Sequence, residues 1–196
     1  MSAADGGGAG GGDGAGGGGG DGDGGGGRGG AGGHPVREAG PADAAVIGQL
    51  LHDFNVEFSE PTPGPERLAA RMRQLLGSSP SREPGCGTSV LLYDEMEGLA
   101  VLRFRAAIWS ETLECYLAEL YVVPELRGRG RGRALMEAAM SLARERGADH
   151  MDLGTGEQDV VARALYESLG FSNRASSPEG EGKPDGPINY FYERGL

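Results

Sequence analysis

The sequence is poor in the residues that build metal sites and disulfide frameworks, with two cysteines and three histidines among 196 residues. Cys86 and Cys115 form no CxxC pair, and His34, His52 and His150 are scattered along the chain. Neither a zinc site nor a disulfide framework is therefore expected. Because no export signal is visible, we expect a cytoplasmic protein with two reduced thiols.

Long apolar segments are also lacking. No run approaches the roughly 20 residues that a membrane-spanning helix needs, so no membrane contact is expected. The formal net charge is −11, with 18 basic against 29 acidic residues. This balance argues against general nucleic-acid binding and is compatible with a cationic partner.

Glycine, by contrast, is abundant: there are 39, most of them before His34. Residues 1–33 are nearly all Gly, Ala and Asp, without a large apolar side chain after Met1. Such a segment cannot bury enough apolar surface to offset its ordering entropy, so we expect a disordered glycine-rich tail. It has neither the apolar core of a signal peptide nor the strict three-residue period of collagen. Residues 34–196 have the size of one domain.

The first part of this domain predicts a short strand at 34–39 and two amphipathic helices. Apolar residues recur at helical spacing between Ile47 and Phe58, after Pro41, and again between Leu68 and Leu76. Three strand-like runs follow, joined by short polar connections. They lie at 88–93, 99–109 and 115–123. This pattern predicts an antiparallel meander.

After Val123 the pattern changes to alternating helices and strands. We expect a helix at 131–146, a strand at 150–153, a helix at 159–169 and a final strand at 188–193. The inward stripe of the second of these helices is expected to be Val161, Leu165 and Leu169. The class is therefore α/β with a mixed sheet, in which a right-handed crossover joins two parallel strands.

The most informative segment runs from Tyr121 to Arg133 and reads YVVPELRGRGRGR. A β-branched strand ends at Pro124, and alternating Arg and Gly lead directly into a helix. Exposed backbone N–H groups at a helix N-terminus bind phosphate, and arginines add charge-assisted contacts. The arginines are Arg127, Arg129, Arg131 and Arg133. The segment is neither a Walker A loop nor a GxGxxG fingerprint.

Two other interpretations of this segment stay open. It could be an RG-type nucleic-acid segment, or a glycine-rich turn with solvated arginines. Its position between a strand and a helix favours phosphate binding, because RG segments usually occur in disordered tails.

Within the segment, Arg127-x-x-Gly130-x-Gly132 resembles the signature of the GNAT superfamily of acetyl-CoA-dependent N-acetyltransferases. The preceding strand AELYVVP and the later segment DVVARALYESLGF are similar to that family too, with Asp159 in place of its usual Asn. The resemblance is specific over 115–171 and extends in outline over 34–196. It implies a GNAT fold, a mixed, mainly antiparallel sheet flanked by helices.

The resemblance also implies where acetyl-CoA binds, without a metal. Its pyrophosphate would lie on the loop amides, and its pantetheine arm would pair with the strand before the loop. In that family a bulge commonly splays this strand from the next, which the sequence alone does not reveal. The residues implied are Leu120, Tyr121, Val122, Arg127, Gly128, Arg129, Gly130, Arg131, Gly132, Arg133 and Asp159.

Glu119 is an ionisable residue inside an otherwise apolar strand, and it is our candidate for the general base or the binder of the acceptor ammonium. Simple alternation places it opposite Leu120 and Val122, on the face of Leu117 and Tyr121. The alternative is a carboxylate paired with an arginine. The next candidates are Glu114 and Tyr116.

By resemblance, Tyr166 would be the phenol that protonates the leaving thiolate. The alternative is a core aromatic whose hydroxyl reaches the surface. Asp159 is expected to cap its helix and touch the cofactor. A backbone N–H of Tyr121 or Val122 would polarise the thioester carbonyl.

The acceptor site is expected between the first two helices and the meander. Its candidate residues are His52, Asp53, Asn55, Glu57, Glu60, Trp109 and Glu111. The acidic members would suit a polycationic amine, although a solvated helix face is the plain alternative. The sequence also loosely resembles aminoglycoside 3-N-acetyltransferases, which have an Asp where Glu119 lies.

These observations favour an enzyme that moves an acetyl group from acetyl-CoA to a primary amine, by direct attack, on a small cationic molecule. Two alternatives remain: a protein lysine or N-terminal acetyltransferase, and a non-catalytic acyl-CoA-binding regulatory module. A homodimer is compatible with either enzyme.

Overall fold

The computed structural model describes residues 35–77, 85–94, 96–173 and 189–196. The predicted tail at 1–33 and most of the connection between α2 and β2 lie outside these ranges. In chain order the elements are β1 (Val36–Glu38), η1 (Pro41–Asp43), α1 (Ala44–Glu57), α2 (Pro65–Gly77), β2 (Gly87–Tyr93), β3 (Gly98–Ala106), β4 (Leu113–Val122), η2 (Pro124–Leu126), α3 (Arg131–Glu145), β5 (Ala148–Gly156), α4 (Val160–Ser168) and β6 (Asn189–Gly195).

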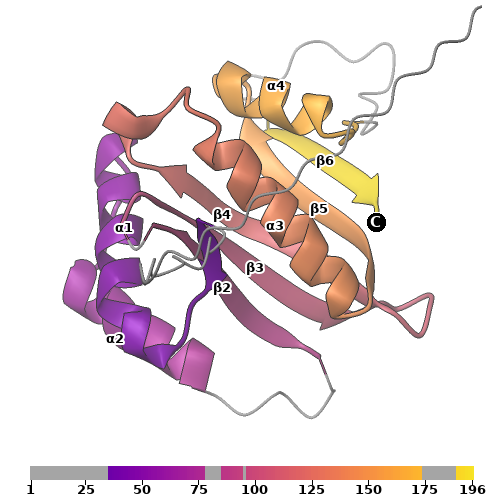
Figure 1. Cartoon of the computed structure of the whole chain (residues 1–196), viewed down its shortest axis with the longest axis horizontal. Helices are drawn as coiled ribbons and strands as arrows, with labels where there is room; N and C mark the ends of the chain where they lie inside the picture. The colour runs from indigo at the N-terminus through magenta and orange to yellow at the C-terminus, as the bar shows by residue number, and fades with distance from the viewer. Residues whose placement is uncertain (1–34, 78–84, 95, 174–188) are drawn as a thin grey trace, which may run out of the picture. The chain divides into compact units, whose positions relative to one another are not determined.

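Within the described residues, six strands form one sheet whose spatial order follows the chain, from β1 to β6 (Figure 1). Neighbouring strands pair antiparallel, except for β4 and β5, which are parallel. Helix α3 makes the crossover between these two strands. The predicted mixed, mainly antiparallel sheet flanked by helices is confirmed.

Helices pack on both faces of the sheet and give two apolar clusters. On one face, which Figure 1 shows crossed by α3, buried residues such as Leu102, Leu135 and Met151 meet. We call this the α3 face. On the other face, Ile47 of α1 packs with Leu99 of β3. We call this the α1 face. No helix in the described part of the chain is long and apolar enough to cross a membrane.

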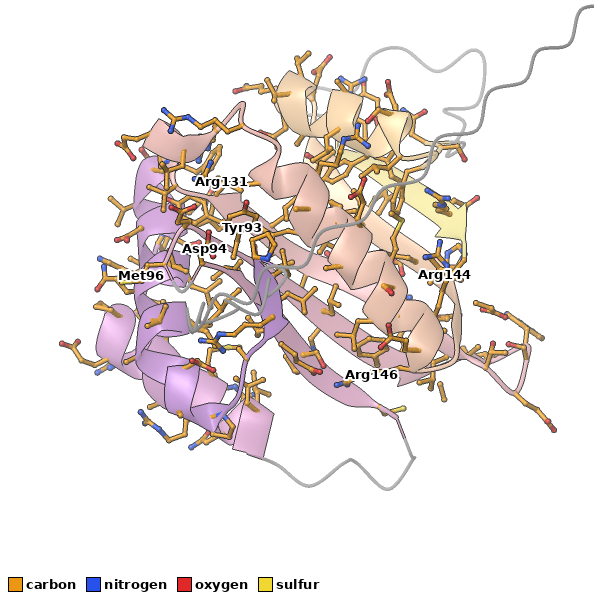
Figure 2. The ribbon with its side chains drawn as sticks, in the orientation of Figure 1. Tyr93, Asp94, Met96, Arg131, Arg144 and Arg146 are labelled. Atoms are coloured by element: carbon orange, nitrogen blue, oxygen red, sulfur yellow. The ribbon has the colours of Figure 1, made fainter. Side chains whose placement is uncertain are left out.

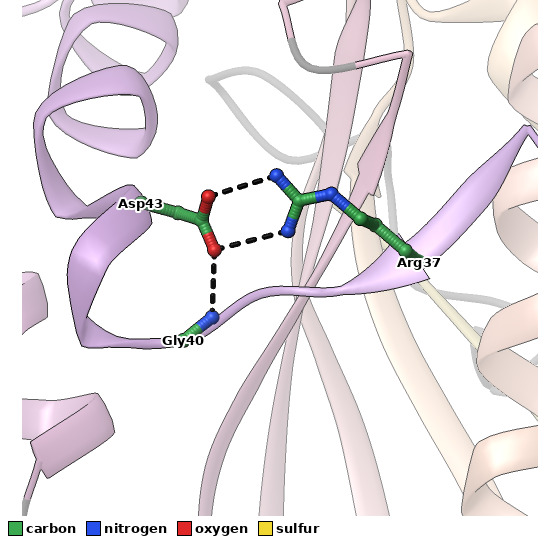
Figure 3. Close-up of polar contacts among 3 residues, drawn as sticks. All are labelled: Arg37, Gly40 and Asp43. Atoms are coloured by element: carbon green, nitrogen blue, oxygen red, sulfur yellow. Dashed lines mark hydrogen bonds and ion pairs between the residues drawn. The ribbon is translucent and has the colours of Figure 1, made fainter.

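Helix α1 is preceded by a short-range polar cluster, which Figure 3 shows. The Asp43 carboxylate accepts hydrogen bonds from both terminal nitrogens of Arg37, at 2.8 and 3.0 Å, and from the Gly40 N–H at 2.8 Å. These bonds, with that of Arg37 the strongest, lower the pKa of Asp43 to about 2. The helix start predicted near Pro41 is confirmed, because η1 begins at Pro41 and α1 follows at Ala44.

Two details of the predicted elements are wrong. The strand predicted to reach Trp109 ends at Ala106, because the chain turns there, and Trp109 is 94% exposed. Val161, predicted to face inward, is 86% exposed. Helix α4 instead faces the core through a stripe with i, i+3, i+4 and i+7 spacing, and Val161 lies one position before it. The stripe is Ala162, Leu165, Tyr166 and Leu169.

Candidate active site

The fourth strand contains a β-bulge. On its β3 side, Leu117 pairs with Leu102 and Glu119 pairs with Val101. Ala118 is therefore an extra residue that faces no partner of its own. A bulge of this kind bends the strand and locally disrupts its hydrogen-bond ladder.

Strand β4 also separates from β5 at the same level. Their parallel pairing ends at Leu117 and Leu153, although β4 continues to Val122 and β5 to Gly156. Beyond this point the β5-facing edge of residues 118–122 has no strand partner in the described part of the chain. Backbone groups on such an edge can pair with an extended ligand.

The bulge decides which side chains share a face. Leu117 and Leu120 both belong to the cluster of the α3 face, while Tyr121 belongs to that of the α1 face. Glu119 pairs with Val101, another member of the α1-face cluster, and so lies on that face with Tyr121. The prediction that Glu119 and Tyr121 share a face is confirmed. The placement of Leu117 with them is wrong, because the extra residue reverses the alternation.

The Glu119 carboxylate has no polar partner among the described residues. It is half-buried, and among the described residues it makes neither a hydrogen bond nor an ion pair. Burial raises its pKa above the usual range. The alternative of a carboxylate neutralised by an arginine is thus not what the described residues show. An unpaired carboxylate with a raised pKa suits a group that takes up a proton.

The loop between η2 and α3 and the first turn of α3 present a row of backbone N–H groups without acceptors in the described part of the chain. None of the six from Gly128 to Arg133 donates to an acceptor in the described ranges. Gly128 and Gly130 have φ of +72° and +82°, which glycine adopts without steric cost. A Cβ on either glycine would meet no protein atom within 4 Å. This open cradle at the N-terminus of α3 fits a phosphate group.

The arginine side chains of the loop are mostly held by the protein. Arg127 donates from both terminal nitrogens to Glu57 of α1, each at 2.7 Å, and from Nε to the Val122 carbonyl at 2.8 Å. Its guanidinium also lies 5.7 Å from the ring centroid of Tyr121. The hydrogen bond to Glu57 raises the pKa of Arg127 further.

The other three arginines differ from one another. Arg131 pairs with Glu97 of the β2–β3 connection. Arg133 donates to the Ser168 hydroxyl of α4 at 2.7 Å. Arg129 is exposed and has no hydrogen bond or ion pair among the described residues. The prediction that all four guanidinium groups meet phosphate stays a prediction, and three of them already have protein partners.

Tyr166 lies on the α3 face, opposite Glu119. Its side chain is 5% exposed, and its ring contacts those of Phe171 and Tyr192 at centroid distances of 6.2 and 5.9 Å. Its hydroxyl makes no hydrogen bond with any described residue. Burial raises its pKa, so the phenol keeps its proton at neutral pH. Glu119 and Tyr166 therefore lie on opposite faces of the sheet.

The start of α3 adjoins the helix that carries Tyr166. A Cβ on Gly132 would lie 3.4 Å from Cδ2 of Leu165. Asp159 occupies the N-cap position of α4, but its carboxylate makes no capping bond. It accepts instead from the Thr155 hydroxyl at 3.0 Å and the Gly156 N–H at 3.1 Å. The predicted capping contact is wrong, because the carboxylate turns back to the end of β5.

The structure does not gather the predicted acceptor residues in one place. Those of α1 mostly have partners: His52 meets Thr62 at 3.1 Å and Asp53 accepts from Gln49 at 2.8 Å. Trp109 and Glu111 lie in the β3–β4 connection, at the start of β4, whereas α1 meets the end of that strand. Eight strand positions separate the two regions, about 26 Å at about 3.3 Å per residue. A single acceptor pocket cannot contain both groups.

A metal site and a reactive thiol find no support in the described residues. No group of three or more His, Cys, Asp or Glu side chains there could hold a metal ion. Cys115 is fully buried, and burial raises its pKa to about 12. Its thiol therefore carries almost no thiolate at neutral pH, and we interpret Cys115 as a core residue.

Residues 49–171 match the acetyltransferase (GNAT) family. The chain belongs to the GNAT acetyltransferase family. The match covers the bulged strand, the arginine–glycine loop and the helix of Tyr166. It confirms the family that the loop signature predicts.

Individual relatives differ in how much of each chain is similar. A crystal structure of a protein from Arthrobacter sp. FB24, assigned as an acetyltransferase, shares 41% identity and a TM-score of 0.63 over 75% of this chain and 89% of that one. Aminoglycoside N(6')-acetyltransferase type 1 of Stenotrophomonas maltophilia is 27% identical over 69% of this chain and 84% of that protein. Mycothiol acetyltransferase of Beutenbergia cavernae is 35% identical over 42% of this chain, which spans only 27% of that relative.

Sequence reasoning missed the two carboxylates that hold the loop arginines, Glu57 and Glu97. The sequence predicts Glu57 only as an acceptor-site residue. Each lies more than 30 positions from its partner, at 70 and 34 residues. No local pattern connects residues so far apart in a single sequence.

Proposed function

We propose that the protein is an N-acetyltransferase that moves an acetyl group from acetyl-CoA to a primary amine of a small, cationic molecule. The observation that carries this proposal is the row of six N–H groups from Gly128 to Arg133, next to the edge of β4 beyond Leu117, both of which lack a partner among the described residues. The first feature fits a pyrophosphate, and the second fits an extended pantetheine arm. Bound acetyl-CoA would supply the activated acetyl thioester.

In this proposal the protein positions groups and moves protons. The cradle and the open edge, through Leu120, Tyr121 and Val122, hold the donor. Glu119 takes the proton of the acceptor amine, directly or through water, on the α1 face. Tyr166 gives its proton to the leaving thiolate on the α3 face. A free N–H of Tyr121 or Val122 would stabilise the oxyanion.

The likeness to an aminoglycoside acetyltransferase over most of that protein's length supports a cationic small-molecule acceptor. The net charge of −11 agrees with it. We further propose that residues 34–196 are the catalytic unit and that deleting 1–33 leaves activity intact. The family match at 49–171 supports this division.

The test is a thiol-release assay with acetyl-CoA against polyamines, aminoglycosides, amino acids and peptides with free amino groups. The expected result is turnover with at least one polycationic amine and weaker turnover with peptides. Turnover with peptides alone would identify a protein acetyltransferase. CoA binding without turnover on any amine would favour a regulatory module, and the absence of CoA binding by calorimetry would refute the proposal.

A further inference from the structure

The arginines of the loop have different surroundings although they alternate regularly in the sequence. Arg127 forms an ion pair with Glu57 of α1, and Arg131 forms one with Glu97 of the β2–β3 connection. Arg129, between them, is exposed and unpaired among the described residues. From this contrast we infer that Arg127 and Arg131 are positioning residues that brace the loop, and that Arg129 contacts a phosphate of bound acetyl-CoA. The inference deepens the proposed function and rests on it for the ligand.

In the first brace, all three nitrogens of the Arg127 guanidinium donate hydrogen bonds. Two nitrogens bind Glu57 in a parallel, two-pronged pair, and the third donates to the carbonyl of Val122. The Tyr121 ring, which contacts Phe54 of α1 at a centroid distance of 5.4 Å, lies beside it. Turning Arg127 toward a phosphate would break three charge-assisted bonds, which are the stronger class of hydrogen bond.

The second brace holds the other end of the loop. Arg131 donates from Nε to the Glu97 carboxylate, and its guanidinium lies 5.4 Å from the ring centroid of Tyr93. Figure 2 shows Arg131 close to Tyr93. The carbonyl of Glu97 also accepts the Val123 N–H at 3.0 Å. One residue of the β2–β3 connection thus contacts the chain both before and after the loop.

Removal of Glu57 or Glu97 should change the affinity for CoA in opposite directions, depending on whether the arginines contact phosphate or brace the loop. Acetyl-CoA is an anion, so a carboxylate beside its site weakens binding by repulsion. If Arg127 and Arg131 contact phosphate directly, removing Glu57 or Glu97 should free a cation and tighten binding. If the pairs are braces, the same change should loosen the loop and weaken binding, because the cradle loses its preorganisation.

The experiment is a calorimetric titration of the full-length protein with CoA, comparing the variants Glu57→Gln and Glu97→Gln. Glu125→Gln is the matched control, because Glu125 belongs to η2 and makes no hydrogen bond or ion pair among the described residues. We expect about three- to tenfold weaker binding for the first two variants, from lost charged hydrogen bonds. Glu125→Gln should bind as tightly as the parent or more tightly. Tighter binding by Glu57→Gln and Glu97→Gln would overturn the braces.

A ligand-free measurement separates the braces from the proposed function. Amide hydrogen exchange over residues 124–134 should be faster in Glu57→Gln and Glu97→Gln than in the parent, and unchanged in Glu125→Gln. Equal exchange in all four proteins would overturn the braces. If the parent itself binds no CoA, the proposed function and the role of Arg129 fail, while the exchange result still decides the braces.

A separate variant tests the phosphate contact of Arg129. Arg129→Gln should weaken CoA binding about tenfold at low salt and less at high salt, because an exposed charge contact is screened. Its ligand-free exchange should match the parent, since Arg129 holds no other element. Parent-like affinity at low salt would refute the phosphate contact.

Discussion

Leu117 and Leu120 of β4 face the same side of the sheet although they are three residues apart. Strict alternation would put them on opposite sides. The extra residue, Ala118, reverses the alternation and leaves Glu119 on the α1 face. The pairing with β5 also ends at this level. One additional residue thus accounts for both the open strand edge and the orientation of the candidate base.

Deletion of Ala118 should lower activity while leaving the stability of the fold nearly unchanged. Without it Leu117, Glu119 and Leu120 alternate regularly, so each keeps its present face, and the α1-face cluster loses only the partly buried Ala118. We expect thermal unfolding close to that of the parent. Loss of the bulge would remove the local bend and so displace the β4 edge beyond Leu117. A displacement of even 1 Å can cost about 10²-fold in rate, so kcat/KM should fall at least that far.

Ala118→Ser is the control for this deletion, because it keeps the extra residue and should keep both stability and activity. A deletion variant that retains full activity would show that the bulge is not needed for the site. One that unfolds would show that the bulge supports the core, contrary to the alternation argument.

The arginine–glycine loop was predictable from sequence, and the bulge was not. Glycines at 128 and 130, followed by a regular apolar helix, mark the loop through local signals. The bulge depends on how β4 pairs with β3 and β5, and the local sequence around Ala118 contains no signal for it. The same limit applies to Glu57 and Arg127, because only the folded chain brings these residues together.

Gly130 offers a test of the cradle that distinguishes backbone from side chain. Its φ of +82° costs another residue roughly 1–2 kcal/mol, and asparagine tolerates this conformation better than alanine. Gly130→Asn should therefore be more stable than Gly130→Ala in thermal unfolding. If phosphate occupies the open space beside Gly130, the longer side chain should bind CoA more weakly in calorimetry. Equal CoA affinity of both variants and the parent would place the phosphate elsewhere.

Tyr166→Phe should lower kcat by roughly 10- to 100-fold while CoA affinity stays near that of the parent. General-acid catalysis is typically worth about 10²–10⁴-fold, and a thiolate is a good enough leaving group to put the effect at the low end. Because burial raises the pKa of Tyr166, the parent should keep this assistance beyond pH 9. Steady-state kinetics with a competent amine measure both parameters.

The control is Tyr192→Phe, which removes a neighbouring hydroxyl bound to Glu167 at 2.9 Å and to Arg163 at 3.1 Å. It should lower the free energy of unfolding by about 1 kcal/mol with kcat unchanged. An unchanged kcat for Tyr166→Phe would assign that ring to packing alone.

Asp43 should make the start of α1 sensitive to acid. Its pKa is about 2 in the folded protein, against an ordinary value of 3.8. The stabilisation is therefore fully present above pH 3.8 and is lost as the pH falls toward 2. Asp43→Asn should lower the free energy of unfolding by about 1 kcal/mol at pH 7, after allowance for solvent screening, and by almost nothing at pH 2. Urea denaturation at both pH values measures this, and a difference independent of pH would contradict it.

The role of Glu119 can be determined from the pH dependence of kcat/KM, because a general base and an ammonium binder predict different profiles. A free alkylamine has a pKa near 10.4, so at neutral pH the acceptor arrives mainly as ammonium. If Glu119 is the base, Glu119→Gln should reduce kcat/KM by about 10²–10⁴-fold near neutral pH. The defect should shrink as the pH approaches 10 and free amine becomes available. The parent profile should fall on the acid side through a pKa above the usual glutamate range, since burial raises it.

If Glu119 only binds the ammonium, Glu119→Gln should raise KM for the amine with little change in kcat at any pH. Glu145→Gln, on the exposed end of α3, controls for the loss of one negative charge and should keep the parent profile.

The stability of the Glu119 variant gives a second measurement. A carboxylate whose pKa is raised by burial destabilises the fold once it ionises, so Glu119→Gln should unfold less easily than the parent at pH 7 but not at pH 3. A variant that gains stability and loses rate would identify Glu119 as a group kept for chemistry. If the rate matches the parent at every pH, Glu119 has no catalytic part, and Glu114 or Tyr116 becomes the candidate.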